Sequence, residues 1–243
     1  MKIFLLILIY ALPFLYASSQ GRTRLSAKAG EPVNWDDQFV IVDKNGGAFH
    51  SYYEGVDGHP YFIENFMNAS IGLNTGKIYN GVKARIDLYK QEIHFKLPSD
   101  SERIALPGLI TEIIFYDTIE SGVHSYKFQS GYPEIDNLKR TNYYQVLSDG
   151  VVTMLKSTVK KINKIKNDMS GEVSSQFDTY EDYYLYIKYE MKRIKKDKDY
   201  LLNLLADKRK EMEGYVADKK INFKSIDSIK KLIDYYNSLS PAF

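Results

Sequence analysis

The stretch GVKARIDLYKQEIHF, Gly81–Phe95, decides the fold class. Apolar residues occupy every second position from Val82 to Leu88, and the alternation resumes at Ile93 after a polar run. A period of two is typical of a strand with one apolar and one polar face. The stretch therefore predicts a β-hairpin, and His94 on its polar face is expected to be exposed to solvent.

Strand patterns continue on both sides of this hairpin. Residues 109–116 are apolar on both faces, which predicts a central strand, and 123–128 are its expected partner. Asp149-Gly150 is a favoured pair for a type I′ turn, so it predicts a hairpin between 143–147 and 151–159. Weaker candidates are 39–42 and 61–71. Residues 181–196 fit two readings, because the alternation from Tyr183 to Tyr189 favours a strand while a helix also fits.

The last part of the chain has helical spacing. Leu201, Leu205, Met212 and Val216 fall on one stripe, and Asp207 is a candidate cap for a second helix. Ser225 is a good N-cap for the last helix, whose apolar face comprises residues 226, 229, 232, 233 and 236. The sequence thus predicts an α+β protein: an antiparallel β-rich N-terminal and central region, residues 38–190, followed by a C-terminal region of two to three helices, residues 191–243.

The N-terminus predicts export. Lys2 precedes an uncharged apolar run. The small residues Ala17 and Ser19 then occupy positions −3 and −1 relative to a signal-peptidase cleavage site between Ser19 and Gln20. Residues 1–19 are therefore expected to be a cleaved signal peptide, and 20–37 a flexible leader. The alternative is an uncleaved anchor, but a spanning helix needs about 20 apolar residues and this run is shorter and contains Pro13. The expected location is periplasmic or extracellular, at the outer surface, with no transmembrane segment after cleavage.

Composition and motifs exclude several classes of chemistry. The chain has no cysteine, so disulfides, iron–sulfur clusters and cysteine nucleophiles are excluded. No zinc-protease, nucleophile-elbow, phosphate-loop or dinucleotide motif occurs. The four histidines, at 50, 59, 94 and 124, do not have metal-ligand spacing. We therefore predict no catalytic residue, no metal site and no cofactor.

Basic residues are concentrated in the second half of the chain, where Lys and Arg outnumber Asp and Glu from residue 151 onward. They predict a surface for an anionic partner, such as an envelope protein or an anionic glycan or lipid surface. Nucleic acid is not expected, because an exported protein seldom meets it. The alternative is an ordinary solvated face. The candidate residues are Lys160, Lys161, Lys164, Lys192, Arg193, Lys195 and Lys196.

Four segments together resemble a group of exported Bacteroidota proteins with no assigned function. They are Gly81–Phe95, Tyr143–Lys156 (YYQVLSDGVVTMLK), Lys195–Leu205 and Leu232–Asn237 (LIDYYN). The resemblance implies a periplasmic or outer-surface location in a Gram-negative bacterium, and it transfers no active site.

These observations favour a non-enzymatic binding or assembly role in the cell envelope. Strand patterns and tyrosines are abundant, the latter numbering 21, and tyrosine suits faces that are partly apolar and partly wet. The alternative is an envelope hydrolase that acts on glycan or peptide through carboxylates that no motif reveals. It would require two carboxylates facing each other across a substrate.

Overall fold

Strands make up most of the protein. The computed structural model describes residues 53–97, 99–119, 122–166 and 171–239. The predicted signal peptide, the leader, the candidate strand 39–42 and His50 lie outside these ranges. The α+β class is confirmed, because the described residues form one large, mainly antiparallel sheet followed by three α-helices.

The sheet has the order β1-β10-β9-β8-β7-β6-β2-β3-β4-β5, and β11 also pairs with β10. β1 is parallel to β10 and meets it at Ser175 and Gln176, whereas β11 meets the other end of β10 at residues 184–187. The strands are β1 (Val56–Asp57), β2 (Met67–Leu73), β3 (Ile78–Asp87), β4 (Glu92–Lys96), β5 (Glu102–Ile104), β6 (Ile110–Ile119), β7 (Gly122–Gln129), β8 (Tyr144–Ser148), β9 (Thr153–Lys166), β10 (Val173–Ile187) and β11 (Glu190–Arg193).

Most of the strand predictions are confirmed. The predicted hairpin is β3–β4, the central strand is β6 between β2 and β7, and the segment 143–159 forms β8 and β9. The ambiguous residues 181–196 contain strand, because β10 runs through them into β11. The alternation of Tyr183 to Tyr189 was therefore the correct signal for this segment.

The helices follow the sheet as α1 (Lys198–Leu204), the 3-10 turn η2 (Ala206–Lys208), α2 (Arg209–Lys219) and α3 (Ile226–Ser238). Ser225 caps α3 as predicted, with its side chain accepting a hydrogen bond from the Ser228 backbone. The expected cap of the second helix is wrong. Lys208 holds the N-cap position of α2, and Asp207 instead accepts a hydrogen bond from the Tyr236 hydroxyl.

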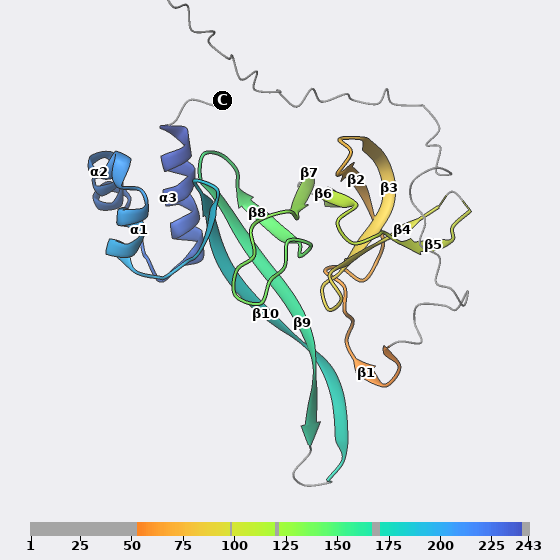
Figure 1. Cartoon of the computed structure of the whole chain (residues 1–243). Helices are drawn as coiled ribbons and strands as arrows, with labels where there is room; N and C mark the ends of the chain where they lie inside the picture. Colours follow the sequence, from red (N-terminus) through yellow and green to blue (C-terminus); the bar gives the residue numbers. More distant parts are fainter. Residues whose placement is uncertain (1–52, 98, 120–121, 167–170, 240–243) are drawn as a thin grey trace, which may run out of the picture.

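Two large apolar clusters hold the fold together. One lies on the curved sheet, is formed mainly by β2, β3, β4, β6 and β7, and contains Phe95, Phe115 and Phe128. The other joins β9 and β10 to the helices, where Met154 and Leu185 pack with Leu232. Figure 1 shows the helices against one end of β8–β10, with β2–β5 on the opposite side of the molecule.

The central part of the polar face of the β3–β4 hairpin is buried, contrary to the prediction, whereas residues 83 and 89 on the same face are exposed. Arg85, Asp87 and His94 are only 5%, 0% and 3% exposed. Segment 53–66 covers this face. Its backbone continues the line of β2, because Phe62 donates to the Ile86 carbonyl and Leu88 donates to the Pro60 carbonyl. Tertiary packing thus converts a solvated face into a buried polar layer.

β9 and β10 extend beyond the sheet as a two-stranded ribbon (Figure 1). They pair continuously from Thr153 and Tyr186 to Lys166 and Val173, whereas β8 borders β9 only as far as Ser157. We call residues 160–166 and 173–179 the arm. It connects to the body through the Lys160 amide, which donates to the Leu88 carbonyl, and through β1.

The tight turns differ from the expected ones. Asp149 does not have a positive φ, so the Asp149-Gly150 pair is part of a longer connection rather than a type I′ turn. The β10–β11 hairpin instead closes through Lys188 and Tyr189, whose φ angles of 50° and 65° are both left-handed. Bulky residues are disfavoured in that conformation, so this turn stores strain.

Replacing Lys188-Tyr189 by Asn-Gly is expected to raise the free energy of unfolding by about 1 kcal/mol, because Asn and Gly adopt left-handed φ at lower cost. Tyr189 is 86% exposed, so little packing is lost. Urea unfolding measures the change. Gln91→Gly is the matched control, since Gln91 has a φ of 59° but bonds the Leu88 and Thr158 carbonyls. We expect the Gln91→Gly variant to be less stable than wild type. If the Asn-Gly variant is also less stable than wild type, the Lys188-Tyr189 turn is not strained.

Candidate functional site

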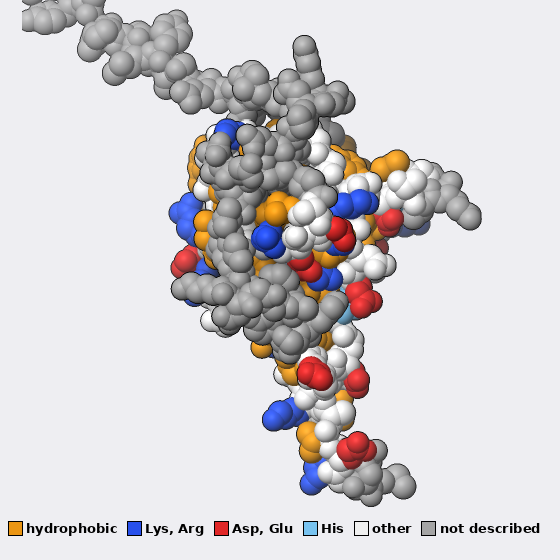
Figure 2. Space-filling model, turned by 90° about the vertical axis from the view of Figure 1, so that its right-hand side faces the viewer, with side chains coloured by type: hydrophobic (Ala, Val, Ile, Leu, Met, Phe, Trp, Pro, Cys, Tyr) orange, Lys and Arg blue, Asp and Glu red, His pale blue; other side chains and the backbone are white. Residues whose placement is uncertain are grey.

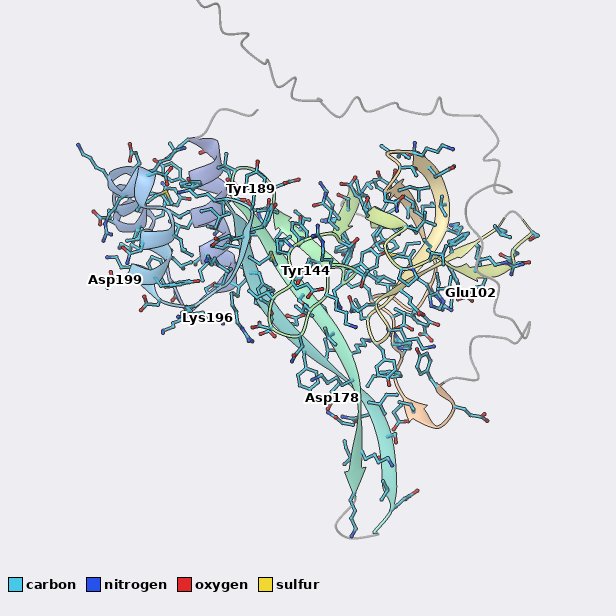
Figure 3. All side chains as sticks on the ribbon, in the orientation of Figure 1. Glu102, Tyr144, Asp178, Tyr189, Lys196 and Asp199 are labelled. Carbon is cyan, nitrogen blue, oxygen red and sulfur yellow. The ribbon has the colours of Figure 1, made fainter. Side chains whose placement is uncertain are left out.

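A charged cluster lies beneath segment 53–66, on the covered face of β3, β4 and β5. Arg85 and His94 are cross-strand partners, and both contact Glu102, which Figure 3 labels beside β5. Glu102 Oε1 lies 2.8 Å from Arg85 Nη2 and 2.7 Å from His94 Nδ1. The Arg85 guanidinium carbon also lies 3.6 Å from the Tyr61 ring centroid and 4.4 Å from that of Phe66. The cluster therefore ties the covering segment to the sheet.

Glu102 is held in its ionised form. Burial raises the pKa of this carboxyl, but the hydrogen bonds from His94 and Arg85 outweigh burial, and the net pKa is lower than usual. Arg85 Nη1 donates to the Glu64 carbonyl as well. Such pairing satisfies charges that would otherwise be costly to bury.

Asp87 and Glu92 face each other at the closed end of the same hairpin. Asp87 accepts hydrogen bonds from the Tyr53 hydroxyl and from the amides of Tyr89 and Lys90. It therefore acts as the acceptor that closes its own turn. Burial raises the pKa of Glu92. Facing carboxylates are what glycoside hydrolysis would need, but here one of them is fully buried and occupied by its own turn.

Other buried polar groups do not form a site. Among the described residues, no group of three or more His, Cys, Asp or Glu side chains is arranged to hold a metal ion. The Tyr144 hydroxyl is buried without a hydrogen-bond partner in the described part of the chain. It lies in an apolar cluster with Leu155, Tyr184 and Met191. We assign it to packing.

The seven predicted surface residues fall into two groups rather than one patch. Lys160, Lys161 and Lys164 lie on β9 in the arm, whereas the other four lie on β11 and the loop before α1. Figure 3 shows the separation, with Asp178 on the arm and Lys196 near the helices. The β10 partners of Lys164 and Arg193 are Ser175 and Tyr184, and nine residues of strand span about 30 Å.

Part of the group near the helices already has partners. Lys192 pairs with Glu190 at 2.6 Å, and Arg193 pairs with Asp182 and Asp136. The Lys195 ammonium lies 5.1 Å from the Tyr200 ring centroid. Lys192 and Arg193 are therefore neutralised by their own neighbours, whereas none of the ion pairs between described residues includes Lys195 or Lys196.

Acidic and basic side chains of the arm lie on different faces of the ribbon, except for Lys161, which shares the face of Asp178. Directly paired residues of antiparallel strands share a face, so the register places Lys160, Lys164 and Lys166 on one face with Val173 and Phe177. We call this the lysine face. No Asp or Glu shares it within residues 160–166 and 173–179. Figure 2 shows blue side chains along one side of the arm and red ones along the other.

The opposite face is a polar network. Asn163 donates to Asp178 and to the Tyr180 hydroxyl, and Gln176 donates to Asp178. Lys161 lies over the Tyr180 ring, 5.0 Å from its centroid. Asp178 thus bonds neighbours on its own face, and the opposite side of the ribbon is left to the lysines.

The three cations of the lysine face differ in burial. Lys160 is half-buried and donates to the His59 carbonyl at 2.6 Å, and burial lowers its pKa. Lys164 and Lys166 are exposed. None of the ion pairs between described residues includes any of the three. Lys166 belongs to the same basic cluster of the sequence as Lys160, Lys161 and Lys164, although it is not one of the seven predicted surface residues.

Comparison with protein-family models, with curated proteins and with solved structures gives no significant match. The resemblance to exported Bacteroidota proteins therefore stays a prediction. Within the described residues, no helix combines the length and apolar character that crossing a membrane requires.

Proposed function

We propose that the protein is exported and has a non-enzymatic binding role in the cell envelope, with an anionic partner held on the lysine face. The observation that carries the proposal is the charge sorting of the arm, in which Lys164 and Lys166 are exposed on a face without acids. Unpaired cations on a projecting element attract an anionic surface and set its orientation. The export prediction supplies the compartment in which glycan, lipid and protein anions are available.

The arm suits binding for a mechanical reason as well. Its inner half is anchored by an aromatic cluster in which Tyr53, Tyr89 and Phe177 make edge contacts, with ring centroids 5.3–5.9 Å apart. The outer lysines therefore extend from a fixed base. A pre-positioned surface loses less conformational freedom on binding than a flexible tail.

Binding to dextran sulfate, a soluble polyanion, tests this proposal. We expect the Lys164→Glu, Lys166→Glu variant to bind at least about ten-fold more weakly than wild type, since each lysine near an anionic surface contributes about 1 kcal/mol. The thermal midpoint should change little, because both side chains are exposed. Isothermal titration calorimetry at low and moderate salt measures the affinity, which should fall as salt rises.

Two control variants carry the same change in net charge. Lys210→Glu, Lys231→Glu reverses exposed lysines of α2 and α3, and Lys195→Glu, Lys196→Glu reverses part of the second predicted group. Both should bind dextran sulfate nearly as well as wild type. If either control weakens binding as much as the arm variant, net charge rather than the lysine face is responsible and the proposal is wrong.

A further inference from the structure

The outermost described part of the arm combines positive charge with exposed apolar side chains. Ile165 is 45% exposed and Val173 is 57% exposed. The register places Val173 opposite Lys166 on the lysine face, whereas Ile165, between Lys164 and Lys166 in sequence, lies on the opposite face of the ribbon. Exposed aliphatic side chains beside exposed lysines suit a partner that accepts both charge and hydrocarbon.

We propose that the partner of the arm is an anionic lipid surface, which rests on the proposed function above and specifies its partner. A lipid interface that receives the ribbon end-on offers phosphate groups to Lys164 and Lys166 and an apolar layer to Val173 on their face and to Ile165 on the opposite face. A sulfated or acidic glycan offers the charge alone. Lysine stems also extend along apolar surface while the ammonium stays with the headgroups.

The geometry of the arm agrees with shallow, end-on contact. The ribbon narrows away from the body (Figures 1 and 2), so its end can reach a surface while the helices and the β2–β5 region stay clear of it. Residues two apart on one face of a strand are about 7 Å apart, which sets Lys164 and Lys166 side by side on the surface. Within the arm Asp178 lies on the other face and farther from the end, whereas the exposed Glu172 directly precedes Val173.

Vesicle flotation with the full chain lacking residues 1–19 tests this inference. We expect wild type to bind vesicles of phosphatidylcholine mixed with phosphatidylglycerol and not vesicles of phosphatidylcholine alone. Ile165→Ser, Val173→Ser should weaken vesicle binding about ten-fold while leaving dextran sulfate binding unchanged, because the charge is retained. The matched control is Val123→Ser, Val151→Ser, which removes exposed aliphatic side chains elsewhere and should have no effect on vesicles. Thermal melts verify that all variants fold.

The outcomes separate the two proposals. Binding of wild type to dextran sulfate but not to phosphatidylglycerol vesicles would overturn the lipid surface and leave the proposed function standing. Binding to neither probe would overturn both. Unchanged vesicle binding by Ile165→Ser, Val173→Ser would also overturn the lipid contact, since charge alone would then account for it.

Discussion

Replacing Glu102 by leucine is expected to lower the free energy of unfolding by about 3 kcal/mol, which is the cost of leaving one partner of a buried ion pair uncompensated. Arg85, whose side chain is 6% exposed, would keep its charge and lose its only carboxylate within the described residues. His94 would lose the same acceptor. Urea unfolding followed by circular dichroism measures the change.

The double variant Arg85→Met, Glu102→Leu separates charge from packing. Replacing both partners of a buried pair by apolar residues is often close to neutral, so the double variant should be more stable than Glu102→Leu alone. Asp234→Ala is the surface control, because its pair with Lys230 is exposed on both sides and should contribute less than about 1 kcal/mol. A Glu102→Leu variant that is as stable as wild type would show that the cluster does not hold segment 53–66.

The same cluster makes stability depend on acid. The folded-state pKa of Glu102 lies below its ordinary value, so its ionised form contributes stability that is present above the unfolded pKa and is lost as the pH falls through the folded pKa. The stability difference between wild type and Glu102→Gln should therefore shrink as the pH falls below about 4.3. Urea titrations at a series of pH values measure it.

Gly150→Ala is expected to destabilise the protein by about 2–3 kcal/mol. The buried backbone amide and carbonyl of Val152 would lose their hydrogen-bond partner, the Asn237 side chain. A Cβ at residue 150 would lie 2.6 Å from Asn237 Cγ, which is closer than real contacts allow. Asn237 accepts from the Val152 amide at 3.0 Å and donates to the Val152 carbonyl at 2.8 Å. Val152 is fully buried, so displacing Asn237 leaves both backbone groups unsatisfied and loosens α3 from β9.

A double-mutant cycle tests this cause. Asn237→Ala alone should cost about 2 kcal/mol, and Gly150→Ala should then cost less than about 1 kcal/mol in the Asn237→Ala background, because the two changes act on one contact. Gly214→Ala is the matched control. Nothing lies within 4 Å of a Cβ at that helical position, so the change should stabilise α2 by about 0.5–1 kcal/mol. If the losses in the free energy of unfolding of the two single variants add up in the double variant, the two changes do not act on one contact.

The candidate site was only partly readable from the sequence. The excess of lysine in the second half of the chain was visible, and so were seven of the cations placed on β9, β11 and the loop that follows. Their separation into two groups, and the sharing of one acid-free face of the arm by Lys164 and Lys166, were not visible. The shared face depends on the register of β9 with β10, and a shift of one residue would move every side chain of a strand to the other face.

The sequence by itself determined which segments become strands and helices, because a period of two or 3.6 follows from local backbone geometry. The Gly81–Phe95 alternation is enough for a hairpin, and Ser225 is enough to begin α3. Only the tertiary structure decided that Arg85 and His94 are buried, since the covering residues 53–66 are brought there by contacts along β3. It also decided that Asp207 bonds Tyr236 instead of capping α2, and that Lys164 and Lys166 share an acid-free face, because these depend on packing between distant segments.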